Sequence, residues 1–426
     1  MIAAIKTNKQ SLLTIPLLVA ALGYFVDIYD LLLFSIIRVP SLKSLGLTDA
    51  QILVDGERII SVQMIGLLLG GLFWGIVGDK RGRLSVLFGS ILLYSVANIA
   101  NGLVHNVHQY ELVRFLAGLG LAGELGAGIT LVSEIVSKEK RGIATSFVAG
   151  IGLIGAIVAF VVKEAFIKAD NSGWQTCYFI GGALGVVLLL LRISVFESGM
   201  FQQIKKADVK RGNFFMLINN RERLKRYLLS ILIGFPSWYV IGVLVTFSKE
   251  FGKAMHILQP IDAGKAVMFA YAGLSVGDIA IGFVSQHLKS RKKALYIWYT
   301  LNAIVIFLFF TIQYHSSAQT MYWLCAALGI SNGYWAIFVT IGAEQFGTNI
   351  RATAATTIPN FVRGLLPLII LLFQVLRSGL SHRGLGADSS YITGAWITGI
   401  IVMIPAFLAA FSLKETFGRD LNFVEV

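Results

Sequence analysis

Charged residues are scarce in this sequence, which excludes most classes of water-soluble protein. Asp, Glu, Lys and Arg make up 14% of the 426 residues, while hydrophobic residues make up 56%. Soluble domains carry roughly 25% charged residues. A soluble core cannot bury so many apolar side chains, so we expect most of them to face lipid. The composition therefore predicts a membrane protein.

Cysteine, histidine and the common catalytic motifs are also rare. Cys177 and Cys325 fall inside apolar stretches and are too few for a disulfide framework. The six histidines are scattered, and no nucleotide-binding loop, metal-ligand cluster or nucleophile elbow occurs. We therefore expect neither enzymatic activity nor a cofactor or metal.

Long apolar stretches recur along the chain, each able to cross a bilayer as a helix of about 20 residues. They fall at residues 11–38, 58–78, 84–104, 109–135, 142–168, 174–195, 226–248, 263–286, 292–313, 320–344, 353–378 and 388–413. The sequence thus predicts an all-α membrane protein with twelve transmembrane helices, in contact with membrane lipid.

Lysine and arginine are unevenly distributed between the connecting segments. With the N-terminus in the cytoplasm, about two thirds of the 36 Lys and Arg residues fall in cytoplasmic segments, as insertion favours. Both termini are therefore predicted to be cytoplasmic. The net charge of +13 has the same origin, so nucleic acid is not an expected partner.

The longest basic stretch divides the chain into two halves. We predict an N-terminal six-helix bundle at 1–195, a cytoplasmic linker at 196–225, and a C-terminal six-helix bundle with a cytoplasmic tail at 226–426. Within the linker, Phe214–Ile218 indicates a short amphipathic helix on the membrane surface. A flexible linker is the alternative.

The segment Gly75-Ile-Val-Gly-Asp79-Lys80-Arg81-Gly82-Arg83 joins the second and third apolar stretches. Two helices can reverse direction tightly where a small-residue helix end, an acid and a basic turn with glycine follow one another. This pattern resembles the loop between helices two and three of the major facilitator superfamily of transporters. A weaker copy begins at Gly282, with Gln286 in place of the acid, as in duplicated transporter folds.

The fourth stretch carries a second resemblance. It contains Arg114 and Glu124, ends in Glu134 and is followed by Lys140-Arg141-Gly142, which is similar to the sugar, phosphate and organic-acid symporter branches of that superfamily. After the tenth stretch, Glu344 is expected to pair with Arg351. The resemblance implies two pseudo-symmetric six-helix bundles, a multi-pass place in a bacterial inner membrane, and a monomer.

The resemblance also implies a gate of charged residues at the cytoplasmic helix ends. Asp79 is expected to reach a helix N-terminus and Arg141, both of which stabilise a carboxylate. Glu134 is expected to pair with Arg83 or Arg141. Alternatively, these charges only set topology and solubility. The predicted gating residues are Gly75, Asp79, Lys80, Gly82, Arg83, Glu134, Arg141, Glu344 and Arg351.

Acids inside the apolar stretches cost about 2.5–3.5 kcal/mol each and usually have a function. Asp27 and Asp30 are three residues apart and share one helix face, where their repulsion favours binding of a proton. Asp30 lies within reach of Arg114; in sugar-porter relatives such a pair is linked to proton coupling. We predict proton coupling through Asp27, Asp30 or Glu124. A static ion pair that fixes packing is the alternative.

In the second half, Asp278 and Arg363 lie at similar depth. An arginine that is not neutralised offers a planar fork to a carboxylate or phosphate, and organic-anion carriers of the superfamily use a basic residue of helix eleven in this way. If Asp278 pairs with Arg363, the arginine is neutralised and anion binding is much less expected. The sequence does not decide whether the two residues pair. The predicted substrate-binding residues are Arg114, Arg363, Tyr24, Tyr29, Trp238, Tyr239, Asp278, Asn332, Trp335 and Asn360.

These observations together predict a secondary transporter. We expect proton-coupled uptake of a small polar, anionic organic metabolite by alternating access. An uncoupled uniporter or exporter of a neutral or zwitterionic solute is an alternative, as is a membrane sensor of the same fold that does not transport. The sequence identifies neither the substrate nor the direction of transport.

Overall fold

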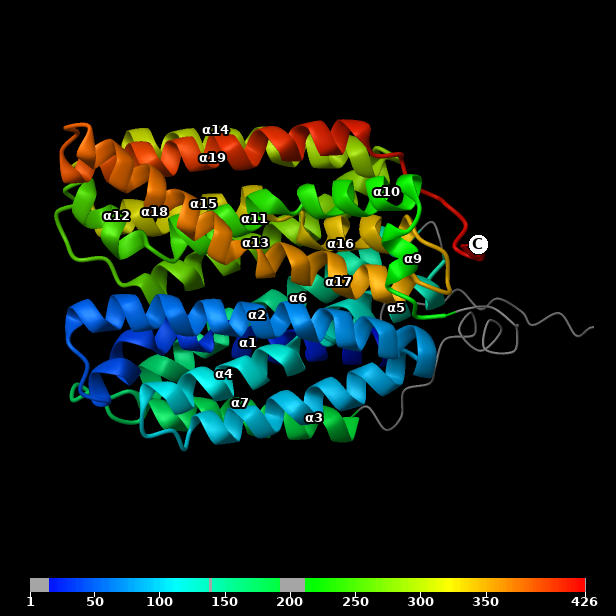
Figure 1. The fold of residues 1–426 in the computed structure, drawn as a ribbon, viewed down its shortest axis with the longest axis horizontal. Helices are drawn as coiled ribbons and strands as arrows, with labels where there is room; N and C mark the ends of the chain where they lie inside the picture. Colours follow the sequence, from blue (N-terminus) through cyan, green and yellow to red (C-terminus); the bar gives the residue numbers. More distant parts are fainter. Residues whose placement is uncertain (1–14, 138–139, 192–210, 426) are drawn as a thin grey trace, which may run out of the picture.

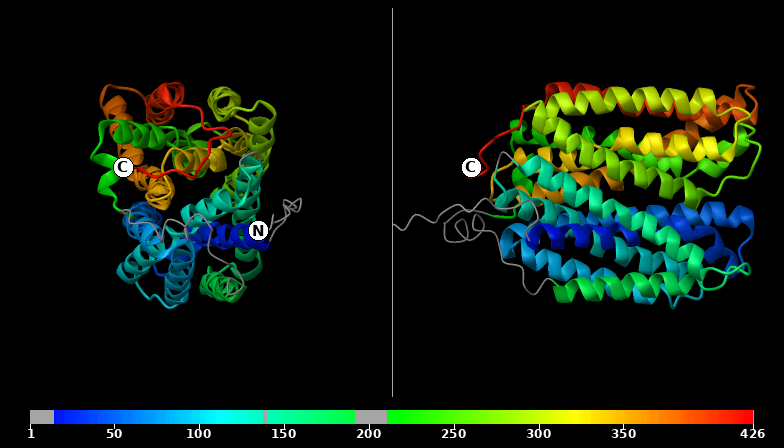
Figure 2. Two further views of the ribbon diagram at one scale, coloured as in Figure 1. Left: turned by 90° about the vertical axis from the view of Figure 1, so that its right-hand side faces the viewer. Right: turned by 180° about the vertical axis from the view of Figure 1, so that it is seen from behind.

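A computed structural model describes residues 15–137, 140–191 and 211–425. In this part of the chain, 12 helical spans are long and apolar enough to cross a membrane. The spans lie side by side along the long axis of the molecule, and Figures 1 and 2 show them grouped in two bundles, one from each half of the chain. The fold is the expected all-helical one.

The first bundle contains the first six spans. Its helices are α1 (Ile15–Ser44), α2 (Asp49–Arg81), α3 (Arg83–Asn101), α4 (Val107–Leu121), α5 (Glu124–Ile135), α6 (Arg141–Phe166) and α7 (Trp174–Leu191). Helix α2 begins well before the apolar stretch expected at 58–78, because Thr48 and Gln51 form a capping box that starts it.

The second bundle contains the last six spans. Its helices are α10 (Arg221–Leu232), α11 (Phe235–Tyr239), the π-helical segment η2 (Val240–Val245), α12 (Ser248–Ala254), α13 (Ala263–His287), α14 (Arg291–Ile312), α15 (Ala318–Asn332), α16 (Trp335–Glu344), α17 (Arg351–Gly364), α18 (Leu366–His382) and α19 (Ala387–Ser412).

Several spans are broken near their middle, which frees backbone groups for other contacts. The fourth span breaks between α4 and α5, and the freed carbonyl of Ala122 accepts a hydrogen bond from Asn360 of the other bundle at 2.8 Å. The tenth span breaks at Gly333, where an added Cβ would lie 2.4 Å from Cα of Gly277. Irregular backbone at this depth is tolerated where it is buried in protein.

The bundles meet along two pairs of helices, α6 with α13 and α2 with α17. We call the end of the molecule that holds Gly75–Arg83 the motif end. The opposite end, where Leu45–Thr48 joins α1 to α2, is the far end. The single-turn helix α9 (Phe215–Ile218) and the C-terminal tail both lie at the motif end (Figure 1). Residues 192–210, which include the first half of the predicted linker, lie outside the described part.

Candidate substrate site and gate

A small cavity lies between the bundles near mid-span. Its lining includes Tyr24 from the first bundle and Trp238, Asn332, Trp335 and Arg363 from the second, all of them buried. The cavity has a volume of about 20 Å³, which holds about one water molecule. The site is therefore closed around its polar and aromatic groups in this structure.

Arg363 is the cation of this cavity. Its guanidinium lies 5.5 Å from the ring centre of Trp335, and its Nη1 donates to Oδ1 of Asn360 at 3.4 Å. Within the described residues its Nε has no hydrogen-bond partner. Arg363 therefore retains donors that an anion could accept from.

Asp278 does not neutralise Arg363 in this structure. Its Oδ1 instead accepts the backbone N–H of Ala336 at 3.0 Å, in the first turn of α16. Among the described residues, no ion pair joins Asp278 to Arg363. A carboxylate at a helix N-terminus is stabilised by the helix dipole, which gives Asp278 a structural role and leaves the arginine available.

Arg114 is a second buried arginine, and it is neutralised. Its Nη1 lies 3.0 Å from Oδ1 of Asp30, and its Nη2 donates to the backbone carbonyl of Asp30 at 3.0 Å. Both side chains are fully buried. Gln63 accepts from Nε of Arg114 at 3.3 Å and also lines a second cavity of about 20 Å³ next to the first. Gln63 therefore connects this ion pair to the space between the bundles.

Two buried acids hold the bundles together at the motif end. Asp79 of α2 accepts the backbone N–H groups of Ala352 at 3.1 Å and Thr353 at 2.8 Å, in the first turn of α17. Glu134 Oε1 lies 2.8 Å from Arg83 Nη2 in its own bundle and 3.1 Å from Arg351 Nη1 in the other. The acids thus cap a helix and bridge two arginines.

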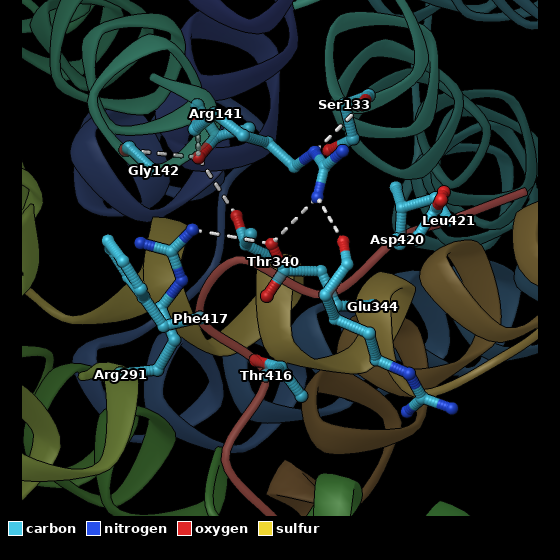
Figure 3. A network of polar contacts seen from close by, with 12 residues as sticks. Ser133, Arg141, Gly142, Arg291, Thr340, Glu344, Thr416, Phe417, Asp420 and Leu421 are labelled. Carbon is cyan, nitrogen blue, oxygen red and sulfur yellow. Dashed lines mark hydrogen bonds and ion pairs between the residues drawn. The ribbon is translucent and has the colours of Figure 1, made fainter. Parts of the chain in front are cut away.

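A third acid, Glu344 of α16, completes this network (Figure 3). Its Oε1 lies 3.4 Å from Arg141 Nη1 of the first bundle and 3.3 Å from Arg291 Nη2 of the second. The hydroxyl of Thr340 donates to that of Thr145 across the same boundary at 2.9 Å. The motif end is therefore closed by polar contacts between the bundles.

The sequence and this architecture agree with known proteins. The model of the Major Facilitator Superfamily matches residues 20–370. The chain belongs to the major facilitator superfamily. It is an integral, multi-pass membrane protein of a transporter family.

Two curated transporters are similar to this chain in sequence, and one solved structure is similar to it in fold. The sialic acid transporter NanX of Escherichia coli is 27% identical over 64% of this chain and 65% of the transporter. The niacin transporter NiaP of Acinetobacter baylyi is 26% identical over 79% of this chain and 81% of the transporter. The proton:xylose symporter XylE, bound to 6-bromo-6-deoxy-D-glucose, has a TM-score of 0.75 and 16% identity, covering 96% and 97% of the two chains.

Some gate partners of this facilitator are those expected and others differ. Glu134 pairs with Arg83, and Asp79 reaches a helix N-terminus, as expected. Arg351 pairs with Glu134, not with Glu344, because it begins α17, which packs against α5, the helix of Glu134. Arg141 pairs with Glu344, while Asp79 lies 3.3 Å from Arg83. Their gating role stays a prediction.

The other predicted gate residues lie in the last turns of α2 and at the α2–α3 turn. Gly82 has φ of 110°, a conformation that favours glycine. A Cβ on Gly75 would lie 3.0 Å from Cα of Thr353 in α17, so this glycine permits close contact between the bundles. Lys80 is exposed.

Two tyrosines predicted for the substrate site lie elsewhere. Tyr29 donates to the carbonyl of Cys177 in α7 at 2.8 Å, and Tyr239 donates to the carbonyl of Ala395 in α19 at 2.7 Å. Both contacts lie within one bundle, and neither tyrosine lines the central cavity. Each sits one residue along its helix from a lining position, too fine a difference for the sequence to resolve.

The remaining predicted residues divide between the cavity and its surroundings. Asp27, Asp30 and Glu124 are buried but do not line the central cavity, and Glu124 lies in the first turn of α5. Asn360 holds Arg363 and the α4–α5 break in place. Sequence reasoning missed Ser237, Tyr271 and Gln63; the only signal was a polar group inside an apolar stretch.

The C-terminal tail, residues 413–425, crosses the motif end (Figure 2). Glu415 accepts the backbone N–H of Arg291 at 2.9 Å and the hydroxyl of Ser290, at the start of α14. Burial acts to raise the pKa of Glu415, but these hydrogen bonds and those from neighbouring amides outweigh it, so the pKa lies below its ordinary value. Glu415 therefore stays ionised near neutral pH.

The tail also contacts the gate itself. The carbonyl of Arg419 accepts from Arg141 Nη1 at 3.3 Å, and the carbonyl of Leu421 accepts from Arg351. These two arginines come from different bundles. The tail therefore supplies neutral acceptors to cations that the three acids alone do not saturate.

Proposed function

We propose that this facilitator takes up a small organic carboxylate together with protons by alternating access. The observation that carries the proposal is Arg363, a buried cation in a cavity lined by aromatic rings, with donors that Asp278 does not occupy. A guanidinium binds a carboxylate with two parallel hydrogen bonds. The rings of Tyr24, Trp238 and Trp335 suit the flat or apolar body of such a substrate.

The substrates named for the relatives support this class. Sialic acid and niacin are both carboxylic acids, and niacin is also aromatic. The sequences of those transporters align with this chain over most of its spans. We therefore expect an acid with a compact, partly apolar body.

The buried pair of Asp30 and Arg114 supports proton coupling. Protonation of Asp30 would leave Arg114 without its counter-ion, which low dielectric makes costly. Gln63 donates to the carbonyl of Leu31 at 3.2 Å and accepts from Arg114, so a change at the pair would reach the space between the bundles. We assign the proton to Asp30, with Asp27 and Glu124 as the other candidates.

The distribution of Lys and Arg supports an orientation with the motif end in the cytoplasm. The closed motif-end network then corresponds to a state that is shut toward the cytoplasm. Opening this network while the far end closes would release the substrate inside the cell. We expect the protein to lie in the bacterial inner membrane.

Uptake by proteoliposomes tests the function. With the lumen more alkaline than the medium, the wild-type protein should accumulate radiolabelled nicotinate, benzoate or cis,cis-muconate. Arg363→Gln should lower kcat/KM about 10- to 100-fold, since a hydrogen bond to a charged group is worth about 1.5–3 kcal/mol. Arg363→Lys should recover part of the loss, and Arg383→Gln, an exposed arginine of the far end, should change nothing.

Two results would contradict the proposal. If Arg363→Gln took up carboxylates like the wild type, Arg363 would not be the anion site. If the wild-type protein bound carboxylates but showed neither accumulation nor counterflow, it would be a sensor and not a carrier.

A further inference from the structure

A basic cleft opens at the far end between the two bundles. It has a volume of about 600 Å³ and is lined by the ends of α1 and α6 and by the start of α13. Its four basic residues are Arg38, Lys163, Lys168 and Lys249, and its two acids are Glu164 and Asp262. Lys163 lies 2.5 Å from Glu164 and 3.1 Å from Asp262, so both acids are already engaged. The cleft therefore has an excess of positive charge.

Arg38 is the buried cation of this cleft. It is only 5% exposed, yet its Nε and Nη1 have no hydrogen-bond partner within the described residues. Its stem packs over Gly56 of α2, where a Cβ would lie 2.5 Å from Cδ of Arg38. An arginine cannot discard its charge when buried, so these donors are aimed at a ligand or at water.

Glu57, on the neighbouring helix α2, is close enough to Arg38 for the two charges to interact. No ion pair within 4.0 Å joins them in the part of the chain described. Oε2 of Glu57 instead accepts from Gln374 of the second bundle at 3.2 Å. Glu57 is therefore a nearby charge, but it does not occupy the free donors of Arg38.

Arg38 shares one face of α1 with the central site. Tyr24, Ile28 and Leu31 line the central cavity, Leu31 and Ser35 line the cavity next to it, and Ser35 and Arg38 line the cleft. From Tyr24 to Arg38, successive lining residues are three or four positions apart, so their side chains form one stripe along the helix. Arg38 lies about 21 Å along α1 from Tyr24, at 1.5 Å per residue.

We propose that Arg38 forms a second binding site, which captures the carboxylate at the far end before it moves along this stripe to Arg363. The proposal rests on the proposed carboxylate substrate for its part in uptake, but binding at the cleft follows from the cleft's charge alone. Any small organic carboxylate should therefore bind there, more weakly than at the central site and more sensitively to salt, because the cleft is open to solvent.

Equilibrium binding of radiolabelled benzoate to the full-length protein in lipid nanodiscs separates the two sites. The wild-type protein should show a strong class and a weak, salt-sensitive class. Arg38→Gln should remove the weak class alone, and Arg38→Lys should restore most of it. The control is Arg58→Gln, an outer arginine paired with Asp55 and Glu111, which should leave both classes intact. Arg363→Gln should remove only the strong class.

Uptake kinetics provide the second measurement. At low salt, Arg38→Gln should lower kcat/KM about 3- to 10-fold through KM, and high salt should reduce the difference from wild type. The proposal is overturned if the weak class is absent from the wild-type protein or survives in Arg38→Gln. If instead Arg363→Gln keeps the strong class, the proposed function fails. The Arg38 site is then decided by whether Arg38→Gln removes the weak class.

Discussion

Two buried arginines of this transporter have opposite surroundings. Arg114 is joined to Asp30 by an ion pair and a backbone hydrogen bond, whereas Arg363 rests on an aromatic ring with a free Nε. Both are nearly inaccessible. Removing one partner of a buried pair costs more than removing both, because the remaining charge has nothing to balance it.

We therefore expect Asp30→Asn to lower the free energy of unfolding by about 3–5 kcal/mol, and the double variant Asp30→Asn with Arg114→Gln to lower it less. Asp30→Asn should also lose accumulation driven by a pH gradient while keeping counterflow. Unfolding in dodecyl sulfate measures the first effect, and proteoliposomes the second.

The control for this prediction is an exposed pair. Lys414 and Glu222 lie 3.4 Å apart with most of each side chain in solvent, so Glu222→Gln should have almost no effect on stability. Equal destabilisation by the single and the double variant would show that the Asp30–Arg114 ion pair does not set the cost.

At the level of single residues, the sequence indicated the depth of buried polar groups better than the direction in which they point. The contact between Asp30 and Arg114 could be predicted, because the two residues lie at similar depth on their helices. Tyr29 and Tyr239 could not be excluded, because one residue turns a side chain by about 100° on a helix and the sequence does not say which face meets the other bundle. Arg38 and Gln63 could not be predicted from the sequence, because a lone polar residue forms no pattern.

At the level of helices, apolar length alone located all twelve spans. It did not show that four of them consist of consecutive shorter helices, because the breaks depend on packing. Gly329 and Gly273 bring α15 and α13 into contact: a Cβ on Gly329 would lie 1.9 Å from the carbonyl oxygen of Ala270, and one on Gly273 would lie 2.0 Å from that of Ala326. Small residues allow such close packing in membranes.

Gly329→Ala should therefore separate α13 from α15 and destabilise the second bundle, by about 1–3 kcal/mol as overpacking typically does. Gly379→Ala is the matched control, because a Cβ there meets nothing within 4 Å; it should be neutral or slightly stabilising, since alanine favours helix. Thermal unfolding of both variants in detergent decides this, and equal melting temperatures would refute the packing argument.

At the level of the whole molecule, the two ends are closed in different ways. Three acids and four arginines seal the motif end, and Figure 3 shows the part of this network around Glu344. A cleft of about 600 Å³ remains at the far end. The sequence indicated a gate, but its pairing depends on which helices face each other across the bundles. That arrangement is a property of the assembled fold.

Glu134→Gln should shift the population toward molecules open at the motif end, because this acid bridges Arg83 and Arg351 of different bundles. Spin labels at Lys80 and Lys289, exposed at that end in opposite bundles, should report longer distances. The two native cysteines are buried and will label poorly. An unchanged distance distribution would show that the remaining contacts close the gate by themselves.

The seal at the motif end consists of charged side chains, and water solvates such groups well. When the bundles part there, water reaches the exposed carboxylates and guanidinium groups, and their solvation replaces much of the attraction that is lost. An apolar seal would have no such compensation, because opening it would expose its hydrophobic surface to water at the full free-energy cost. In the proposed transport cycle, a polar seal thus keeps the closed and open states similar in free energy, so that the binding of one proton or solute decides between them.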